Sequence, residues 1–415
     1  MPSQRPVRRA DALPDGARPG ALSRGLCAAA GSRPAGAAPG ADHVGDLLDA
    51  ARGDRPRRLP GARPPDLPDA DPQALARLAH LGHRKAARVR RGAARAGRRV
   101  SDTLVVGAGW AGLAAAVGLV EAGHRVSVID AAPVPGGRAR TVALRLDDAT
   151  TIDVDNGQHL LIGAYRSTLA LIGRIGTDPD TVLARSRLRL SGPGGFELRA
   201  APLPAPLNLG IGLLAARGMP WGERIAMVRA MAGLAARGPA SVADGTTVAH
   251  WLAATRQPAA LVARLWTPLC IGALNTPPER ACARAFAQVL CDALLARAAD
   301  ADFLLPRATL GDVLPRPASD WLAARGATLR WRTACRALLR DRDGRWQAST
   351  DAGPLQADRV VLAVPPPQVA RLLAGTVPAS RLAVFDAFEH EPIATVWLAW
   401  SERLRLPEVV MLGER

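Results

Sequence analysis

The chain of 415 residues is poor in several residue types, and the shortages exclude whole classes of protein. Its five cysteines are scattered without a CxxC pair, which excludes a zinc ribbon and a disulfide scaffold and fits a reducing compartment. No apolar run follows the first basic residues, so no secretory signal is visible. We therefore expect a cytoplasmic protein without a metal site.

The first 99 residues lack the residue types that build a core. They contain no Ile, Phe, Trp, Tyr, Thr, Asn or Glu, and prolines and glycines interrupt them throughout. Such a segment cannot bury enough apolar surface to offset its chain entropy. We expect residues 1–99 to be a basic, low-complexity, disordered segment outside the fold. They are either a linker or upstream sequence translated ahead of a start at Val100.

Most of the net charge of +17 belongs to this same segment. Residues 1–100 hold a surplus of 11 positive charges, whereas residues 101–415 hold a surplus of 6. Residues 75–98 could form a basic amphipathic helix, and one alternative is that this helix makes a peripheral contact with the inner membrane. A nucleic-acid tail is disfavoured because no aromatic residue is available for base stacking.

A dinucleotide-binding pattern follows the basic segment. Leu104–Val106 is typical of a buried strand, the run Gly107–Gly112 follows at once, and Leu113–Glu121 is typical of a helix. A second strand, Arg125–Ile129, completes the βαβ unit. This context makes a membrane span over the uncharged residues 103–120 the weaker interpretation.

Each glycine of the run has a physical role. Gly107 permits a tight turn, Gly109 lets the backbone approach a diphosphate at the helix N-terminus, and Gly112 lets helix and strand pack closely. Asp130 ends the second strand, where a carboxylate accepts hydrogen bonds from the adenosine ribose and disfavours a 2′-phosphate.

A second phosphate-binding element lies six residues beyond Asp130. Gly136 and Gly137 expose backbone N–H groups, and Arg138 adds a guanidinium fork for phosphate oxygens. A plain NAD dehydrogenase does not need this second element, so the combination points to FAD. With it, residues 103–141 resemble the flavin amine oxidase and phytoene desaturase superfamily.

Further stretches resemble one branch of that superfamily, the hydroxysqualene dehydroxylases or squalene-associated FAD-dependent desaturases of hopanoid biosynthesis. These stretches are DNGQHLLIGAY at 155–165, 266–277 and 303–310, and the resemblance extends over 103–412. It implies an apolar isoprenoid substrate and the reduction of hydroxysqualene to squalene.

In this branch an acid must protonate the oxygen that leaves the substrate. The resemblance places residues 153–159 beside the flavin ring, so Asp155 and His159 are the candidates for catalysis, with Asp153 third. Taken alone, such a polar turn is also typical of a solvated loop.

Residues 200–300 are apolar and helical in pattern. The functional interpretation is an apolar tunnel for a polyprenyl chain, and the alternative is a plain helical core. The expected helices are Leu207–Ala216, Gly222–Ala236, Val248–Ala254, Ala259–Leu269 and Ala281–Ala298.

The chain then returns to the flavin domain. The expected strands are Thr328–Arg332, Cys335–Leu339, Arg345–Thr350, Asp358–Val364 and, in the substrate domain, Thr395–Trp400. The resemblance puts Cys335 where the family grips adenine through its main chain. Nothing after Pro392 resembles the closing segment of the superfamily, so we expect a chain that stops short of it.

Alternation of strands and helices predicts an α/β fold, with a Rossmann-like FAD-binding domain interrupted by a largely helical substrate domain. The expected divisions are 1–99 as the basic segment, 100–200 and 321–378 as the FAD-binding domain, 201–320 as the substrate-binding region, and 379–415 as the start of a substrate-domain strand.

Three other functions remain open from the sequence. A carotenoid desaturase runs the opposite redox direction on a similar hydrocarbon. An amine oxidase would want an aromatic pair at the flavin face, which the 4% aromatic content and the single tyrosine, Tyr165, disfavour. The third is a shortened, non-catalytic chain that binds a lipid.

Overall fold

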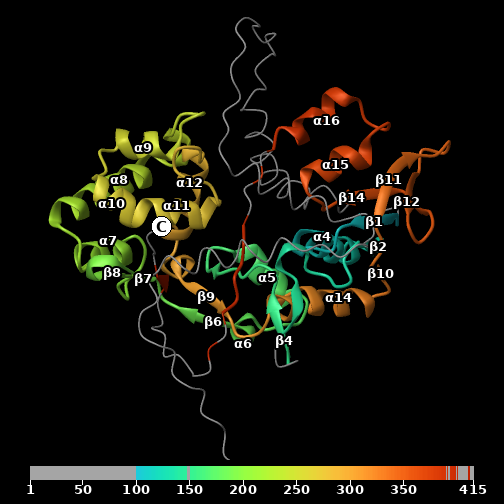
Figure 1. The fold of residues 1–415 in the computed structure, drawn as a ribbon, viewed down its shortest axis with the longest axis horizontal. Coiled ribbons are helices and arrows are strands. Elements are labelled where there is room, and N and C mark those ends of the chain that lie inside the picture. The colour runs from blue at the N-terminus through green and yellow to red at the C-terminus, as the bar shows by residue number, and fades with distance from the viewer. Residues whose placement is uncertain are drawn as a thin grey trace, which may run out of the picture. The chain divides into compact units, whose positions relative to one another are not determined.

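The computed structural model describes residues 100–146, 150–388, 390, 393–398, 400 and 410–411, all within one unit of the chain, Asp71–Arg415. The basic segment 1–99, with the amphipathic helix expected at 75–98, lies outside the described residues. Figure 1 labels the elements that follow.

A parallel sheet of four strands organises the nucleotide-binding part of the molecule. Its strands are β1 (Asp102–Val106), β2 (Arg125–Ile129), β10 (Thr328–Arg330) and β14 (Arg359–Leu362), in the spatial order β10-β2-β1-β14. All three pairings are parallel. The chain leaves β1 toward β2 on one side and returns to pair β14 on the other, which is the order of a dinucleotide-binding sheet. The α/β class is confirmed.

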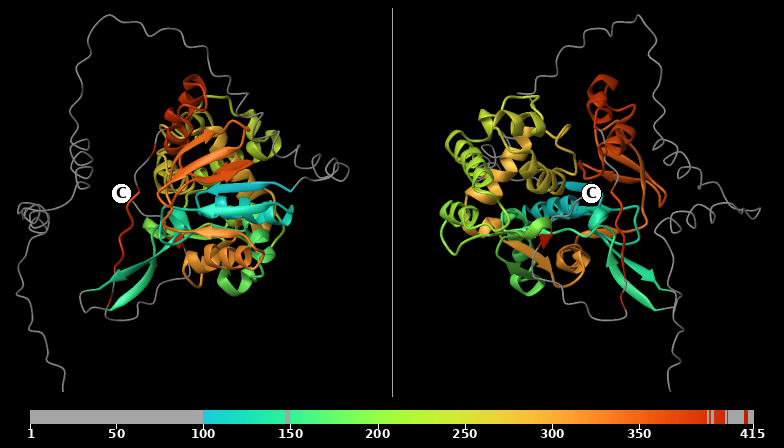
Figure 2. Two further views of the ribbon diagram at one scale, coloured as in Figure 1. Left: turned by 90° about the vertical axis from the view of Figure 1, so that its right-hand side faces the viewer. Right: turned by 60° about the vertical axis from the view of Figure 1, so that its left-hand side comes forward.

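Two layers cover this sheet. On one face, the helices α4 (Trp110–Glu121) and α14 (Pro315–Ala323) contribute Leu113, Val117 and Leu322 to a core with the strand residues Val105 and Val128. On the other face, an antiparallel sheet of β11 (Cys335–Arg340), β12 (Trp346–Thr350) and β13 (Leu355–Ala357) packs with α15 (Pro366–Leu373). Figure 2 shows these elements from two further directions.

Smaller sheets lead away from the parallel sheet. The hairpin of β3 (Thr141–Arg145) and β4 (Thr151–Asp155) follows the turn Gly137–Ala139. A second sheet has the order β5-β9-β6, with β5 at Leu161–Ile162, β9 at Phe303–Pro306 and β6 at Leu183–Ser186. A third pairs β7 (Arg189–Gly192) with β8 (Phe196–Arg199) and with β15 (Val410–Met411). The short helices α5 (Arg166–Arg174) and α6 (Pro179–Val182) connect β5 to β6.

The apolar region between residues 200 and 300 is helical, as expected. It contains α7 (Leu207–Leu214), α8 (Trp221–Arg237), α9 (Val248–Ala254), α10 (Ala259–Leu261), which continues through a π-helical turn into α11 (Thr267–Leu274), and α12 (Ala283–Leu290). Trp251, Trp266 and Phe286 meet edge to face, with ring centroids 6.0 to 6.4 Å apart. These rings join the core on the inward faces of the helices.

The expected strand structure near the end of the chain needs correction. The strand expected at Thr395–Trp400 does not form in its described residues, because 395–398 and 400 belong to no helix or strand, and Val396 is 77% exposed. Residues 379–386 instead form a helix, α16. Cys282 is exposed directly before α12. Within the described ranges, no helix is both long and apolar enough to cross a bilayer.

Candidate cofactor site and flavin-side turn

Steric limits explain two of the three glycines in the loop after β1. Gly107 has φ +104°, and a Cβ built there would lie 2.5 Å from the carbonyl oxygen of Ala363, just beyond β14. A Cβ at Gly112 would lie 1.9 Å from the carbonyl oxygen of Gly107. A larger residue at either position therefore disrupts the turn and the contact between helix and strand.

Gly109 is different because the space around it is open. A Cβ built there would meet a single atom within 4 Å, the Cα of Gly137 at 3.9 Å. The backbone N–H of Gly136 donates to the carbonyl oxygen of Ala108 over 2.8 Å, so the two glycine loops lie against each other. Gly109 thus exposes its backbone at the carboxyl end of β1, at the point where the strand order reverses.

The N-terminus of α4 has free backbone N–H groups that could bind an anion. No side chain caps it, and no acidic residue lies in its first turn. The indole Nε1 of Trp110, the first residue of the helix, is buried without a hydrogen-bond acceptor. Buried donors are normally satisfied, so this orphan indicates a missing acceptor. Trp110 was not among the site residues expected from the sequence, where its only signal is its place inside the glycine run.

Asp130 connects the glycine loop after β1 with the segment that leads into β11. Its Oδ2 accepts from the N–H of Ala108 at 2.6 Å and its Oδ1 from the N–H of Ala132 at 2.8 Å. Since a carboxylate offers about four acceptor sites, lone pairs remain for ribose hydroxyls. The N–H of Thr333 donates to the carbonyl oxygen of Asp130 at 2.8 Å, which brings the start of β11 close by.

Cys335, at the start of β11, is half-buried, and its Sγ lies 3.7 Å from the carbonyl oxygen of Ala337. Burial raises the pKa of the Cys335 thiol. The protonated thiol is therefore favoured over the thiolate at this position.

Arg138 follows Gly136 and Gly137 and lies beside the polar turn 153–159. Its side chain is exposed and pairs with no acidic group in the described part of the chain. A Cβ at Gly157 would lie 3.2 Å from the carbonyl oxygen of Arg138, and the N–H of Asn156 donates to the carbonyl oxygen of Arg140 at 2.8 Å. The turn 153–159 therefore lies directly against the turn formed by Gly136, Gly137 and Arg138.

Asp155 is buried where β4 ends. Its Oδ1 accepts from the backbone N–H of Leu310 at 2.8 Å, the first residue of α13 (Leu310–Val313). Burial raises the pKa of Asp155, the Leu310 hydrogen bond opposes this, the carboxylate of Asp312 adds to the rise and His159 lowers it. The protonated form of Asp155 is therefore favoured relative to an ordinary carboxyl.

His159 lies in the same turn and is exposed. Its Nδ1 is 2.5 Å from the carbonyl oxygen of Gly157. A carbonyl can only accept, so Nδ1 carries the proton and Nε2 is left to exchange one with a ligand. Asp153 is exposed and lies 3.9 Å from Arg316, an ion pair at the surface.

The described residues contain no cluster of three or more His, Cys, Asp or Glu side chains that could hold a metal ion. The open face at Gly109, the uncapped helix, the orphan indole N–H and the free Arg138 together fit a dinucleotide diphosphate.

Comparisons with known proteins agree with this geometry. Residues 110–413 match the model of the flavin containing amine oxidoreductase family. The chain is similar to a hydroxysqualene dehydroxylase of Rhodopseudomonas palustris, 33% identical over 69% of this chain and 68% of that protein. It is also similar to a probable zeta-carotene desaturase of Synechococcus elongatus, 26% identical over 56% of this chain and 50% of that protein.

Among solved structures, an oxidoreductase from Methanosarcina mazei matches with a TM-score of 0.51 at 15% identity, over 69% of this chain and 64% of that chain. That likeness shows the fold. The chain thus spans about two thirds or less of the length of these relatives.

Proposed function

The chain belongs to the flavin containing amine oxidoreductase family, whose cofactor is FAD, and from that premise we propose that it reduces an allylic polyprenyl alcohol, hydroxysqualene, to the hydrocarbon squalene. The observation that carries the proposal is the 33% identity to a hydroxysqualene dehydroxylase over 309 residues. When bound, FAD in its reduced form supplies the hydride for this chemistry.

The residues that would hold FAD are those of the two glycine loops and their neighbours. The diphosphate would meet the N–H groups at Gly109 and at the start of α4, with Arg138 beside them. Asp130 would accept from the adenosine ribose, and the main chain near Cys335 would lie at the adenine end. The indole N–H of Trp110 would find its acceptor on the cofactor.

The overall conversion replaces a C–O bond by a C–H bond and releases water, so the leaving oxygen must gain a proton. In its imidazolium form His159 is suited to deliver it, because the side chain is exposed and its Nε2–H is not committed to the protein, while Nδ1–H keeps its contact with the Gly157 carbonyl oxygen. Asp155 is the second candidate, because burial raises its pKa and favours the protonated form.

The two roles can be separated by substitution. In Asp155→Asn the side chain still offers an oxygen to the N–H of Leu310 but holds no acidic proton, while His159→Gln removes the imidazole at an exposed position. If His159 is the donor, His159→Gln lowers kcat by about 10²-fold or more and Asp155→Asn does not. The reverse result assigns the proton to Asp155.

A carotenoid desaturase is the second candidate, favoured by the similarity to the Synechococcus elongatus protein. The test supplies FAD-loaded protein with hydroxysqualene under reducing conditions and, separately, with zeta-carotene under oxidising conditions. Formation of squalene without any new double bond in zeta-carotene supports the proposal. The opposite product pattern refutes it in favour of the desaturase.

A further inference from the structure

The helices α7 and α8 present a run of large apolar side chains to solvent. On α7, Leu207, Ile211 and Leu214 are spaced for one face and are exposed, whereas Leu209 and Leu213 on the opposite face are buried. On α8, Trp221 and Ile225 are 62% and 57% exposed. Isolated exposed apolar residues are ordinary, but contiguous patches mark interaction surfaces.

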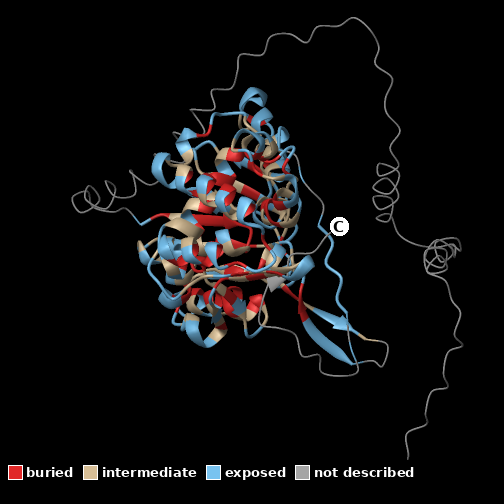
Figure 3. Ribbon diagram, turned by 90° about the vertical axis from the view of Figure 1, so that its left-hand side faces the viewer, coloured by how far each residue is buried: buried red, intermediate tan, exposed pale blue. Residues whose placement is uncertain are grey.

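Contacts of Arg224 join these two sets into one surface. Its guanidinium lies 4.7 Å from the ring centroid of Trp221, its Nε donates to the carbonyl oxygen of Met219 at 2.8 Å, and its Nη1 donates to the carbonyl oxygen of Leu214. The end of α7 and the start of α8 are therefore held together. We call Leu207, Ile211, Leu214, Trp221 and Ile225 the apolar ridge. Figure 3 shows the side of the molecule that carries it.

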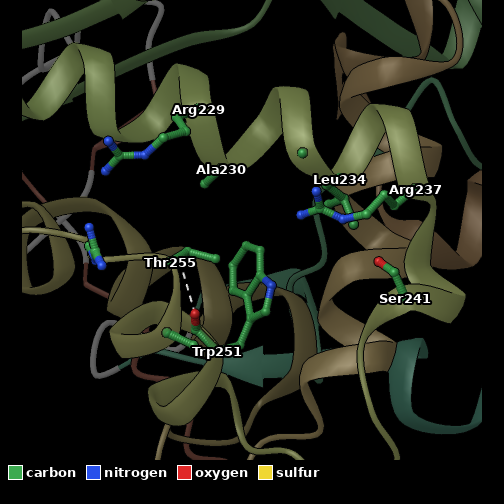
Figure 4. Close-up of a pocket in the computed structure, with 10 residues that line it drawn as sticks. Arg229, Ala230, Leu234, Arg237, Ser241, Trp251 and Thr255 are labelled. Carbon is green, nitrogen blue, oxygen red and sulfur yellow. Dashed lines mark hydrogen bonds between the residues drawn. The ribbon is translucent and has the colours of Figure 1, made fainter.

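A basic pocket continues from the ridge along α8. Arg229 lies one turn beyond Ile225 and is exposed, and it lines a pocket of about 350 Å³ with Arg237, Arg256 and the indole of Trp251. Figure 4 shows Trp251 rising from α9 toward α8, with Arg229 and Arg237 to either side. Within the described ranges, none of these three arginines forms an ion pair or donates a side-chain hydrogen bond.

We propose that the apolar ridge and the basic pocket together dock the protein on an anionic phospholipid bilayer. Large apolar side chains next to a group of unpaired guanidinium groups match the two parts of such a surface, its acyl layer and its phosphates. The ridge enters the boundary between headgroups and acyl chains, and the pocket receives a lipid phosphate. The assignment uses only α7, α8 and α9 and does not rest on the proposed substrate.

The test measures binding of the full chain to vesicles of phosphatidylglycerol and phosphatidylcholine by co-sedimentation. Each basic side chain near an anionic bilayer contributes about fivefold to affinity, so Arg229→Gln/Arg237→Gln should weaken binding by about thirtyfold. Trp221→Ser/Ile225→Ser should weaken it by about tenfold or more, because two large side chains no longer enter the bilayer.

A matched control makes the same kinds of change on α16. Arg381→Gln/Val384→Ser removes an exposed arginine and an exposed apolar residue far along the chain, and it should bind vesicles as the unaltered protein does. All the altered side chains are exposed, and unchanged urea midpoints verify that each variant is folded.

Two outcomes overturn the proposal. One is that the ridge and pocket variants bind vesicles as tightly as the control variant. The other is that soluble glycerol phosphate displaces the protein from vesicles while the ridge variant binds normally, which would make the pocket a site for a free phosphate compound.

Discussion

At the scale of single residues, the glycine positions divide into two that the fold requires and one, Gly109, that the fold leaves free. A Cβ at Gly107 or Gly112 collides with backbone, whereas a Cβ at Gly109 meets one atom at 3.9 Å. Since the protein itself leaves room at Gly109, we propose that its small size serves the close approach of the cofactor diphosphate. Substitutions at Gly107 or Gly112 should therefore lower the stability of the fold, whereas a substitution at Gly109 should lower cofactor binding.

Gly109→Val is therefore expected to fold and to lose FAD, because its side chain would occupy the space of the diphosphate. The flavin content of the purified protein should fall at least tenfold while the urea midpoint changes little. Gly118→Val is the matched control, since Gly118 lies exposed in the same helix with nothing near its Cβ. Equal flavin content in the two variants would contradict the placement of the cofactor.

The pKa of Asp155 leads to a prediction about stability. Its carboxyl has a raised pKa in the folded state, so the folded protein holds its proton to higher pH than the unfolded chain does. Stability from this group is full at acidic pH and is lost as pH rises from the ordinary carboxyl pKa through the raised value. Asp155→Asn removes this dependence, so the variant should gain stability relative to the unaltered protein as pH rises.

Urea unfolding at a series of pH values from acid to neutral measures the difference in unfolding free energy between Asp155→Asn and the unaltered protein. The other carboxyl groups are the same in both proteins, so their contributions cancel. A second variant, Asp155→Ala, should be less stable than Asp155→Asn by about 1–3 kcal/mol, because it leaves the buried N–H of Leu310 without an acceptor. If the difference between Asp155→Asn and the unaltered protein is flat with pH, the raised pKa is wrong.

At the scale of elements, the sequence was informative wherever a helix or strand is determined by its own pattern. Arg125–Ile129 and Val248–Ala254 form with the expected bounds. Thr395–Trp400 has the β-branched and aromatic composition of a strand, yet a strand exists only where a partner strand pairs with it. The described residues there have none, so local pattern alone misled the prediction.

A series of buried hydrogen bonds through Gln257 joins separate elements of the helical region, and no sequence pattern indicated it. The Nε1 of Trp266 donates to the Oε1 of Gln257 at 2.9 Å, and the Nε2 of Gln257 donates to the carbonyl oxygen of Ala226 at 3.0 Å. Gln257 thus connects α8 to the π-helical turn before α11. Its role could not be predicted because both partners lie in other elements.

Gln257→Leu should lower the free energy of unfolding by about 2–4 kcal/mol, because the buried indole N–H of Trp266 and the carbonyl of Ala226 would both lose a partner. His250→Gln, at an exposed position of α9, should change it by less than about 0.5 kcal/mol. Urea denaturation compares the two, and similar small effects would show that this hydrogen-bonded chain is unimportant.

At the scale of the whole molecule, the βαβ unit and the α/β class followed from the sequence, but the assembly of the site did not. The hydrogen bond from Leu310 to Asp155 joins residues 155 positions apart, and the glycine loops at 107–112 and 136–137 meet only because the chain folds back. Contacts of that range depend on how the elements pack in three dimensions. Spacing along the chain therefore named the candidate residues without showing which of them are buried.

Reduction of an allylic polyprenyl alcohol by FAD bound to this chain is the central proposal. The most direct measurement mixes the FAD-loaded, chemically reduced protein with hydroxysqualene in the absence of oxygen and follows the visible absorbance of flavin. We expect the flavin to reoxidise with the formation of one squalene per flavin, and to stay reduced when squalene itself is added. A flavin that stays reduced with hydroxysqualene, in protein shown to hold FAD, would contradict the claim.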